Sequence, residues 1–239
     1  MAEIVRIENL VKEFPMAGGA FRALDGITLN FGAGEFAGLV GPSGSGKTTL
    51  LNIIGTLDFP TRGTVEVLGV DTRKLSHREA ARLRNEKIGF IFQTFNLFPV
   101  YTVYENVEFP LLLQKVPAAE RKKRVTEALD WVGLTDKLKM KPAQLSGGEA
   151  QRVAIARAIV KQPALVLADE PTANLDAENS HNILQTMEKI NGALNTTFIF
   201  ATHDEKVIAY LRRKISLDDG RVKADERFVE KGESGHVTS

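Results

Sequence analysis

The chain has no cysteine and no long hydrophobic run among its 239 residues. Without cysteine it has neither disulfides nor thiolate metal sites, which fits a reducing compartment. Its apolar runs all fall short of the about 18 to 20 residues that a membrane-spanning helix needs. Residues 1–8 also lack the basic and apolar regions of a secretory signal. We therefore expect any work at a membrane to require a second chain.

An excess of charge of either sign is also missing. The 31 Lys and Arg residues nearly balance the 30 Asp and Glu residues, and the net charge is +1. A chain with so little net charge has no overall field to attract nucleic acid or acidic lipid. The hydrophobic content of 43% and the chain length suit one globular domain. The composition therefore predicts a single globular domain with no nucleic-acid partner.

The first chemical motif present is a phosphate loop, Gly41-Pro42-Ser43-Gly44-Ser45-Gly46-Lys47-Thr48. It fits the pattern G-x-x-x-x-G-K-[ST] and lies between a strand candidate at 36–40 and a helix candidate at 48–57. Its glycines allow backbone N–H groups to face one anion at the helix N-terminus. Lys47 supplies a cation for the β- and γ-phosphates, Thr48 supplies a hydroxyl ligand for Mg²⁺, and Thr49 completes the predicted nucleotide site. The strand–loop–helix context argues against a chance match in a glycine-rich turn.

The second motif is a pair of carboxylates at the end of an apolar run. Leu165 to Ala168 predict a buried strand, and Asp169 and Glu170 follow it directly. A carboxylate at this place, beside a phosphate loop, can hold Mg²⁺ through water, which is the role predicted for Asp169. Glu170 is placed to polarise an attacking water. The alternative is an acidic strand end or a helix cap, a common use of Asp-Glu.

The third motif is Leu145-Ser146-Gly147-Gly148-Glu149, far from the phosphate loop in sequence. Small residues allow a backbone to approach a phosphate closely, and a helix beginning near Glu149 would point its positive end outward. A Ser-Gly-Gly turn that merely caps a helix fits the local pattern equally well. The residues alone leave both interpretations open.

These motifs, in this order, resemble the ABC ATPases, whose cassettes pair head to tail and close on ATP. The resemblance implies an α/β fold with a P-loop NTPase sheet core, an inserted helical lobe and an antiparallel β subdomain. It implies that Ser146, Gly147 and Gly148 of one copy close over ATP bound to the other copy. It also implies that residues 171–176 contact the partner cassette, and that ATP and Mg²⁺ are the cofactors.

The resemblance assigns three further residues. It implies that Phe14 stacks on adenine, that Gln93 touches Mg²⁺ and the attacking water, and that His203 contacts the γ-phosphate. Each has a plainer alternative: a core phenylalanine, a surface glutamine at a strand end, and a residue at a helix N-terminus. Glu170, His203 and Gln93 are thus the predicted catalytic residues, and Thr48, Gln93 and Asp169 the predicted metal ligands.

The domain organisation is predicted from the same pattern. We expect one ABC ATPase domain over residues 1–239, with core and β subdomain at 1–96 and 162–225. Helical periodicity and few strand candidates predict a helical lobe at 97–161. Residues 215–222 predict a hairpin with an Asp-Gly turn, and the polar residues 230–239 predict a disordered tail.

A narrower resemblance covers residues 55–63, 92–99 and 102–107. These segments resemble the branch of lipoprotein-releasing (LolD-type) and macrolide-exporter (MacB-type) ATPases. This implies a homodimer that drives a separate integral membrane permease of the FtsX-like type, at the cytoplasmic face of the inner or plasma membrane. The alternative within the branch is a division-type ATPase that transmits force to cell-wall enzymes without transport. The permease selects the substrate, so the cassette does not identify it.

Two other functional classes fit less well. Chromosome-maintenance ABC ATPases carry long coiled coils between the two glycine motifs, and the interval from Lys47 to Ser146 is too short for one. Translation-associated ABC proteins fuse two cassettes and bind ribosomes, whereas this chain has one cassette and almost no net charge.

The apolar run after Gln93 raises a further hypothesis. Phe95, Phe98 and Tyr101 belong to it, and such a run is either the joint between sheet and helical lobe or a socket for a permease helix.

Overall fold

Two β-sheets form the frame of the protein. The computed structural model describes residues 2–17 and 19–228, so the tail predicted to be disordered at 230–239 lies outside the described residues. The larger sheet has six strands in the order β10-β9-β3-β8-β7-β6, all parallel except β10. Its strands are β3 (Phe36–Val40), β6 (Ile88–Ile91), β7 (Leu165–Asp169), β8 (Thr197–Thr202), β9 (Arg213–Asp218) and β10 (Arg221–Arg227).

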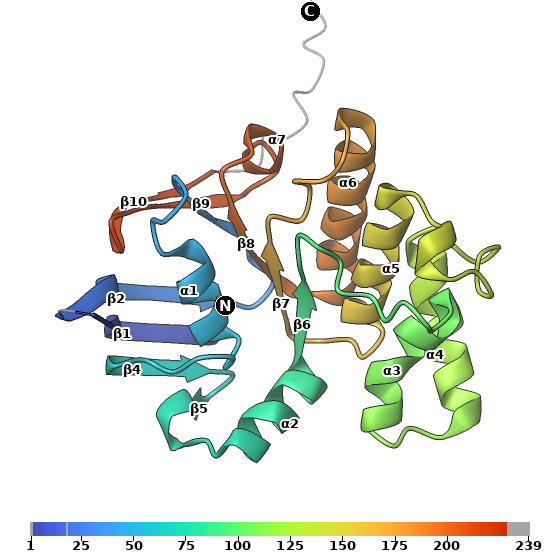
Figure 1. Ribbon diagram of the computed structural model, residues 1–239, viewed down its shortest axis with the longest axis horizontal. Helices are drawn as coiled ribbons and strands as arrows, with labels where there is room; N and C mark the ends of the chain where they lie inside the picture. The colour runs from blue at the N-terminus through green and yellow to red at the C-terminus, as the bar shows by residue number, and fades with distance from the viewer. Residues whose placement is uncertain (1, 18, 229–239) are drawn as a thin grey trace, which may run out of the picture.

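The smaller sheet is antiparallel and has the order β2-β1-β4-β5. Its strands are β1 (Glu3–Met16), β2 (Gly19–Gly32), β4 (Arg62–Val67) and β5 (Val70–Asp71). It lies at the left of Figure 1, beside the phosphate-loop helix α1 (Lys47–Ile54). This sheet is the antiparallel part predicted from the family resemblance.

Three helices form a group at the other side of the larger sheet, at the right of Figure 1. They are α3 (Val103–Leu113), α4 (Ala118–Trp131) and α5 (Gly147–Ile159), and they lie in sequence between β6 and β7. The other helical elements are α2 (His77–Lys87), α6 (Ala177–Leu194), α7 (Glu205–Ile208), η1 (Thr72–Lys74) and η2 (Pro142–Gln144). Helix α2 is a feature that the sequence reasoning did not identify.

The alternation of side chains along the central strands creates two hydrophobic cores. On β7, Val166 and Ala168 face the core shared with helices α3 to α6, while Leu165 and Leu167 face the core shared with α1 and the antiparallel sheet. All four are fully buried. A parallel strand buried on both faces reads as a continuous apolar run, which explains why this segment was predicted as a buried strand.

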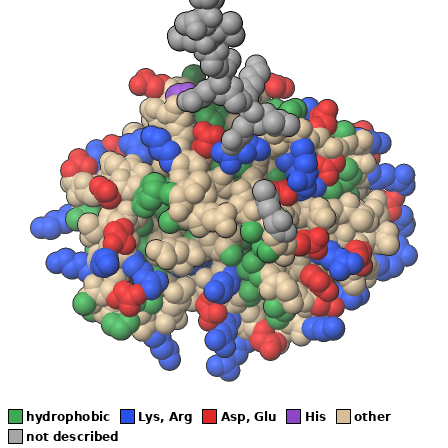
Figure 2. All heavy atoms as spheres, turned by 180° about the vertical axis from the view of Figure 1, so that it is seen from behind, with side chains coloured by type: hydrophobic (Ala, Val, Ile, Leu, Met, Phe, Trp, Pro, Cys, Tyr) green, Lys and Arg blue, Asp and Glu red, His purple; other side chains and the backbone are tan. Residues whose placement is uncertain are grey.

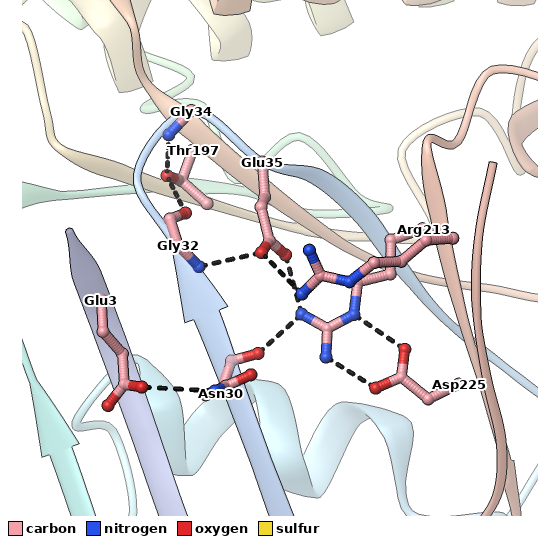
Figure 3. A network of polar contacts seen from close by, with 9 residues as sticks. Glu3, Asn30, Gly32, Gly34, Glu35, Thr197, Arg213 and Asp225 are labelled. Carbon is pink, nitrogen blue, oxygen red and sulfur yellow. Dashed lines mark hydrogen bonds and ion pairs between the residues drawn. The ribbon is translucent and has the colours of Figure 1, made fainter. Parts of the chain in front are cut away.

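A buried arginine joins the two sheets (Figure 3). Arg213 on β9 is 4% exposed and donates both Nε and Nη2 to the Asp225 carboxylate, at 2.8 and 2.7 Å. Its Nη1 donates to Asn30 O of β2 at 2.6 Å and to Glu35 Oε2 at 2.8 Å. Removing a partner would leave the buried guanidinium without part of its compensating charge, which is destabilising. The network therefore fixes the antiparallel sheet against the edge of the larger one.

Several local predictions are confirmed and some boundaries were wrong. The hairpin at β9–β10 turns at Asp219-Gly220, where both residues have positive φ (46° and 69°), as a type I′ turn requires. The helix predicted from Ala177 to Leu194 is α6. The helix expected at 48–57 ends at Ile54, and the helix expected near Glu149 begins at Gly147, because Ser146 already caps it.

The surface carries both signs of charge. Figure 2 shows Lys and Arg side chains interspersed with Asp and Glu over the face opposite to Figure 1, with small hydrophobic areas between them. Among residues 2–17 and 19–228, none of the helices has the length and apolar character of a membrane span.

Candidate nucleotide-binding site

The phosphate loop connects the end of β3 to the start of α1. Its glycines are required by geometry at two positions. Gly46 caps α1 with a φ of 97°, and a Cβ there would lie 2.7 Å from Ala23 O. A Cβ at Gly41 would lie 2.1 Å from Leu217 O. The loop is therefore held tightly between β2 and β9, and no side chain caps the first N–H groups of α1.

The Lys47 ammonium curls back over this loop. Nζ donates to Gly41 O at 2.7 Å and to Pro42 O at 2.9 Å, and the residue is 7% exposed. Burial lowers the pKa of Lys47, while the nearby Glu170 and Asp169 carboxylates oppose that shift. The ammonium is thus held against two carbonyls of the loop, with the Glu170 and Asp169 carboxylates near it.

Thr48 and Asp169 meet although they come from distant parts of the chain. Thr48 Oγ1, on α1, donates to Asp169 Oδ1, at the end of β7, at 3.2 Å. Burial raises the pKa of the Asp169 carboxyl, and the hydrogen bond from Thr48 opposes this. In the described residues, no cluster of three His, Cys, Asp or Glu side chains could hold a metal alone. One carboxylate with one hydroxyl suits Mg²⁺, which takes its other ligands from substrate phosphates and water.

Glu170 and His203 form a direct pair. His203 Nδ1 lies 2.6 Å from Glu170 Oε1, and Thr202 Oγ1 donates to Glu170 Oε2 at 3.2 Å. Glu170 has a φ of 45°, an uncommon conformation for a residue other than glycine, and its N–H donates to Ala201 O at 2.9 Å. The β7–β8 pair therefore aims this carboxylate at the histidine. The sequence predicted both residues but not their contact.

These groups border one cleft of about 540 Å³. The predicted residues that line it are Phe14, Ser43, Gly44, Gly46, Lys47, Thr48, Thr49, Gln93, Glu170 and His203, and Phe21, Ala23 and Ala173 complete the lining. The predicted residues Gly41, Pro42, Ser45 and Asp169 lie behind this lining, in the loop or against Thr48. Gln93 enters from the end of β6, and its carbonyl accepts from Asn174 Nδ2 at 2.9 Å.

Two phenylalanines stand at the mouth of the cleft. Phe14 on β1 and Phe21 on β2 are cross-strand partners, 38% and 51% exposed. Phe14 is therefore not an ordinary core residue. Lys12 Nζ lies 4.9 Å from its ring centroid. The sequence reasoning missed Phe21; the Gly18-Gly19 pair between two aromatic-bearing segments was the signal that could have predicted the hairpin and placed Phe21 opposite Phe14.

The Ser146-Gly147-Gly148 turn lies outside this cleft. Ser146 Oγ accepts from Glu149 N at 3.2 Å, and Glu149 Oε2 accepts from Ser146 N at 2.8 Å, a capping box at the start of α5. A Cβ at Gly148 would lie 2.5 Å from Asn179 Oδ1, so the turn packs closely on α6. Within one chain the structure keeps this turn apart from the phosphate loop.

Comparisons with known proteins identify the family. The family model described as "ABC transporter" matches residues 24–173. The lipoprotein-releasing system ATP-binding protein LolD of Geobacter metallireducens is 44% identical over 94% of this chain and 100% of that protein. The uncharacterized ABC transporter ATP-binding protein YvrO of Bacillus subtilis is 45% identical over 94% of this chain and 97% of that protein.

A solved structure matches over nearly the whole length. It is the dimeric post-hydrolysis state of the ATP-binding cassette MJ0796 of Methanocaldococcus jannaschii, bound to ADP and Pi. The TM-score is 0.88 at 42% identity, covering 95% of this chain and 99% of that chain. The predicted fold, an α/β P-loop core with helical and antiparallel β parts, is confirmed by this match. The chain belongs to the ABC transporter ATP-binding family and is an ATP-binding, ATP-hydrolysing cassette.

Proposed function

We propose that this cassette dimerises head to tail on Mg-ATP and drives a separate integral membrane permease of the lipoprotein-release or macrolide-export type. One observation supports the proposed dimer. The Ser146-Gly147-Gly148 turn is held by a capping box and is exposed at Ser146 and Gly147, but it lies outside the cleft of its own chain. A second copy is the source of the nucleotide it would meet. The dimeric MJ0796 structure supports this arrangement.

The roles of the cleft residues follow from their positions. Lys47, with the backbone N–H groups of residues 43–49, would bind the phosphates. Thr48, Gln93 and Asp169 would hold Mg²⁺, which supplies charge neutralisation at the β- and γ-phosphates when bound. Phe14 would stack on the adenine, with Phe21 beside it.

Glu170 is the proposed general base. Its two oxygens are held by different groups, since Thr202 donates to one and His203 lies beside the other. A proton on Nδ1 lets His203 donate to the carboxylate, and a bond from Nε2 to a γ-phosphate oxygen would require a second proton on that nitrogen. Glu170 then accepts a proton from the attacking water, at an orientation fixed by its strained backbone.

The permease contact is proposed at the segment that follows Gln93. Phe98 and Tyr101 are 38% and 37% exposed, and their rings lie 5.4 Å apart, with Phe109 packed 4.8 Å from Phe98. Val103 in the same run is fully buried, so the segment serves both as joint and as exposed surface. The exposed part would receive a permease helix at the cytoplasmic face of the membrane. The helical lobe would then span residues 97–161, as predicted.

Three of the relatives are lipoprotein-releasing system ATP-binding proteins LolD, which favours transport over the division-type alternative. Co-purification of the full chain with its membrane partner would identify the permease, which selects the transported substrate.

The test of the head-to-tail proposal is Ser146→Arg. We expect unchanged ATP affinity in the monomer but loss of ATP-dependent dimerisation and turnover, because the bulky side chain occupies the place of the partner's γ-phosphate. Ser76→Arg is the matched control, since Ser76 caps α2 with the same kind of capping box and does not line the nucleotide cleft. Loss of ATP binding by the Ser146→Arg monomer would show that the turn acts in its own chain and would overturn the proposal.

A further inference from the structure

The segment after Gln93 contains a bend that its own residues do not favour. Phe95 and Asn96 have φ values of 61° and 50°, the left-handed region. Two consecutive residues of this kind cost free energy and persist only where the surroundings hold them. In Figure 1 the segment leaves the end of β6 and crosses toward α3, past α5.

Arg157 of α5 holds this bend. Its Nη1 donates to Asn96 O at 2.5 Å, and its Nη2 donates to Phe95 O at 2.7 Å. Burial lowers the pKa of Arg157 to about 10, so the guanidinium remains charged at neutral pH. Among the described residues no acidic side chain forms an ion pair with it. The two carbonyls of the bend are the groups that compensate a largely buried cation.

A second partly buried cation lies one turn later, just past the end of α5. Lys161, just beyond the helix end, donates Nζ to Arg84 O at 2.6 Å, and burial lowers its pKa to about 8. Lys161 therefore attaches the end of α5 to α2, whereas Arg157 attaches α5 to the Gln93 segment. The same helix begins at the capping residue Ser146. One rigid element thus links the turn that faces a partner cassette to the loop that enters the cleft.

We propose that Arg157 is a positioning residue that transmits the orientation of α5 to Gln93. When the Ser146 turn engages a partner's nucleotide, α5 moves as a unit, and its guanidinium carries the Phe95–Asn96 bend and Gln93 with it. This inference rests on the proposed role of Gln93 in hydrolysis. The plainer alternative is that Arg157 only stabilises the joint between β6 and the helical group.

The first experiment measures steady-state ATPase kinetics of the full chain. We expect Arg157→Met to lower kcat about tenfold while KM for ATP changes less than about twofold, because the variant disturbs positioning and leaves the phosphate site intact. Lys161→Met is the matched control: it removes an equally buried cation-to-carbonyl contact that does not touch the Gln93 segment. It should lower the melting temperature to a similar degree and keep kcat within about twofold of wild type. Equal losses of kcat in the two variants would overturn the proposal.

The second experiment is a double-mutant cycle with Gln93→Ala. If Arg157 acts through Gln93, Arg157→Met will cause no further loss of kcat in the Gln93→Ala background. Additive losses would overturn the inference while leaving the role of Gln93 in place. Wild-type turnover of Gln93→Ala alone would instead refute the proposed role of Gln93, and the inference with it.

Arg157→Lys decides the matter if Arg157→Met does not fold. Lysine keeps the charge but offers one compact donor group for two carbonyls, so we expect a fall in kcat of about threefold. That fall should also vanish in the Gln93→Ala background. Wild-type kcat for Arg157→Lys, with Arg157→Met unfolded, would show a role in stability alone.

Discussion

Two helix N-termini in this molecule use glycine to bring backbone N–H groups to the surface, and they differ in what surrounds them. Helix α1 begins at Gly46 with no side-chain cap and opens into a cleft lined by side chains from six other parts of the chain. Helix α5 begins at Ser146 with a complete capping box and lies outside that cleft. The first lines a cleft of its own chain, and the second is the surface that we propose receives nucleotide from another copy. The two N-termini thus have similar local sequences, and their tertiary surroundings determine the different role of each.

The largest expected effect is on the rate of ATP hydrolysis in the cleft at the N-terminus of α1. Glu170→Gln keeps the shape of the side chain but removes the base, so hydrolysis should slow by about 10²- to 10⁴-fold while ATP binding persists. We expect an ATP-trapped dimer by size exclusion, which would bring the two helix N-termini together. Glu205→Gln, at an exposed acid in the first turn of α7, is the control. A monomeric variant with wild-type turnover would contradict the assignment.

The next prediction concerns ATP binding at the N-terminus of α1, to which the N-terminus of α5 in the same chain should not contribute. Lys47→Ala removes the cation that lies within the loop, and ATP affinity should fall on the order of 100-fold, since hydrogen bonds to charged groups are the strong ones. The fold should survive, because within residues 2–17 and 19–228 the hydrogen bonds of Lys47 Nζ go to carbonyls of its own loop. Isothermal titration and a thermal melt check both expectations. Wild-type affinity in the folded variant would refute the phosphate-loop assignment.

A smaller effect concerns the base-binding end of the cleft. Phe14→Ala should raise the dissociation constant for ATP by about tenfold, the loss expected for one stacked base. Phe21→Ala should have a weaker effect of the same sign, because Phe21 is the more exposed of the pair. Comparing ATP with inorganic triphosphate distinguishes stacking from phosphate binding: neither variant should alter binding of triphosphate. A loss of triphosphate binding would mean that the hairpin supports the loop.

The smallest effect tests the packing of the α5 terminus. Gly148→Ala places a Cβ 2.5 Å from Asn179 Oδ1, and crowding of this kind costs about 1 to 3 kcal/mol of folding free energy. We expect a lower melting temperature with unchanged ATP affinity of the monomer. Adding Asn179→Ala removes the obstacle and should restore part of the stability. A variant with unchanged stability would show that the turn and the Asn179 side chain can shift apart at no cost in folding free energy.

The sequence alone predicted the locally encoded parts of the cleft, such as the phosphate loop at α1, better than the contacts around them. The phosphate loop, the buried strand before Asp169 and the hairpin at Asp219-Gly220 all depend on local patterns, and all three are present. The sequence did not predict the place of Phe21, the contact between Glu170 and His203, or the hydrogen bonds of Arg157 to the Phe95–Asn96 bend. Phe21 pairs with Phe14 in one hairpin, so its signal was local and was missed. The other two contacts join residues far apart in the chain, and no local period reports such a contact.

What the sequence by itself determined is the set of chemical groups and their order, because phosphate binding needs a fixed run of glycines, a lysine and a hydroxyl next to one another. The family resemblance follows from that order. Only the tertiary structure decided which groups share a cleft and which do not. Parallel pairing of β3, β8 and β7 brings Thr48, Asp169, Glu170 and His203 to one edge of the sheet. The separate packing of α5 on α6 leaves Ser146 exposed and outside that cleft, and in the proposed dimer one chain therefore contributes different groups to two sites.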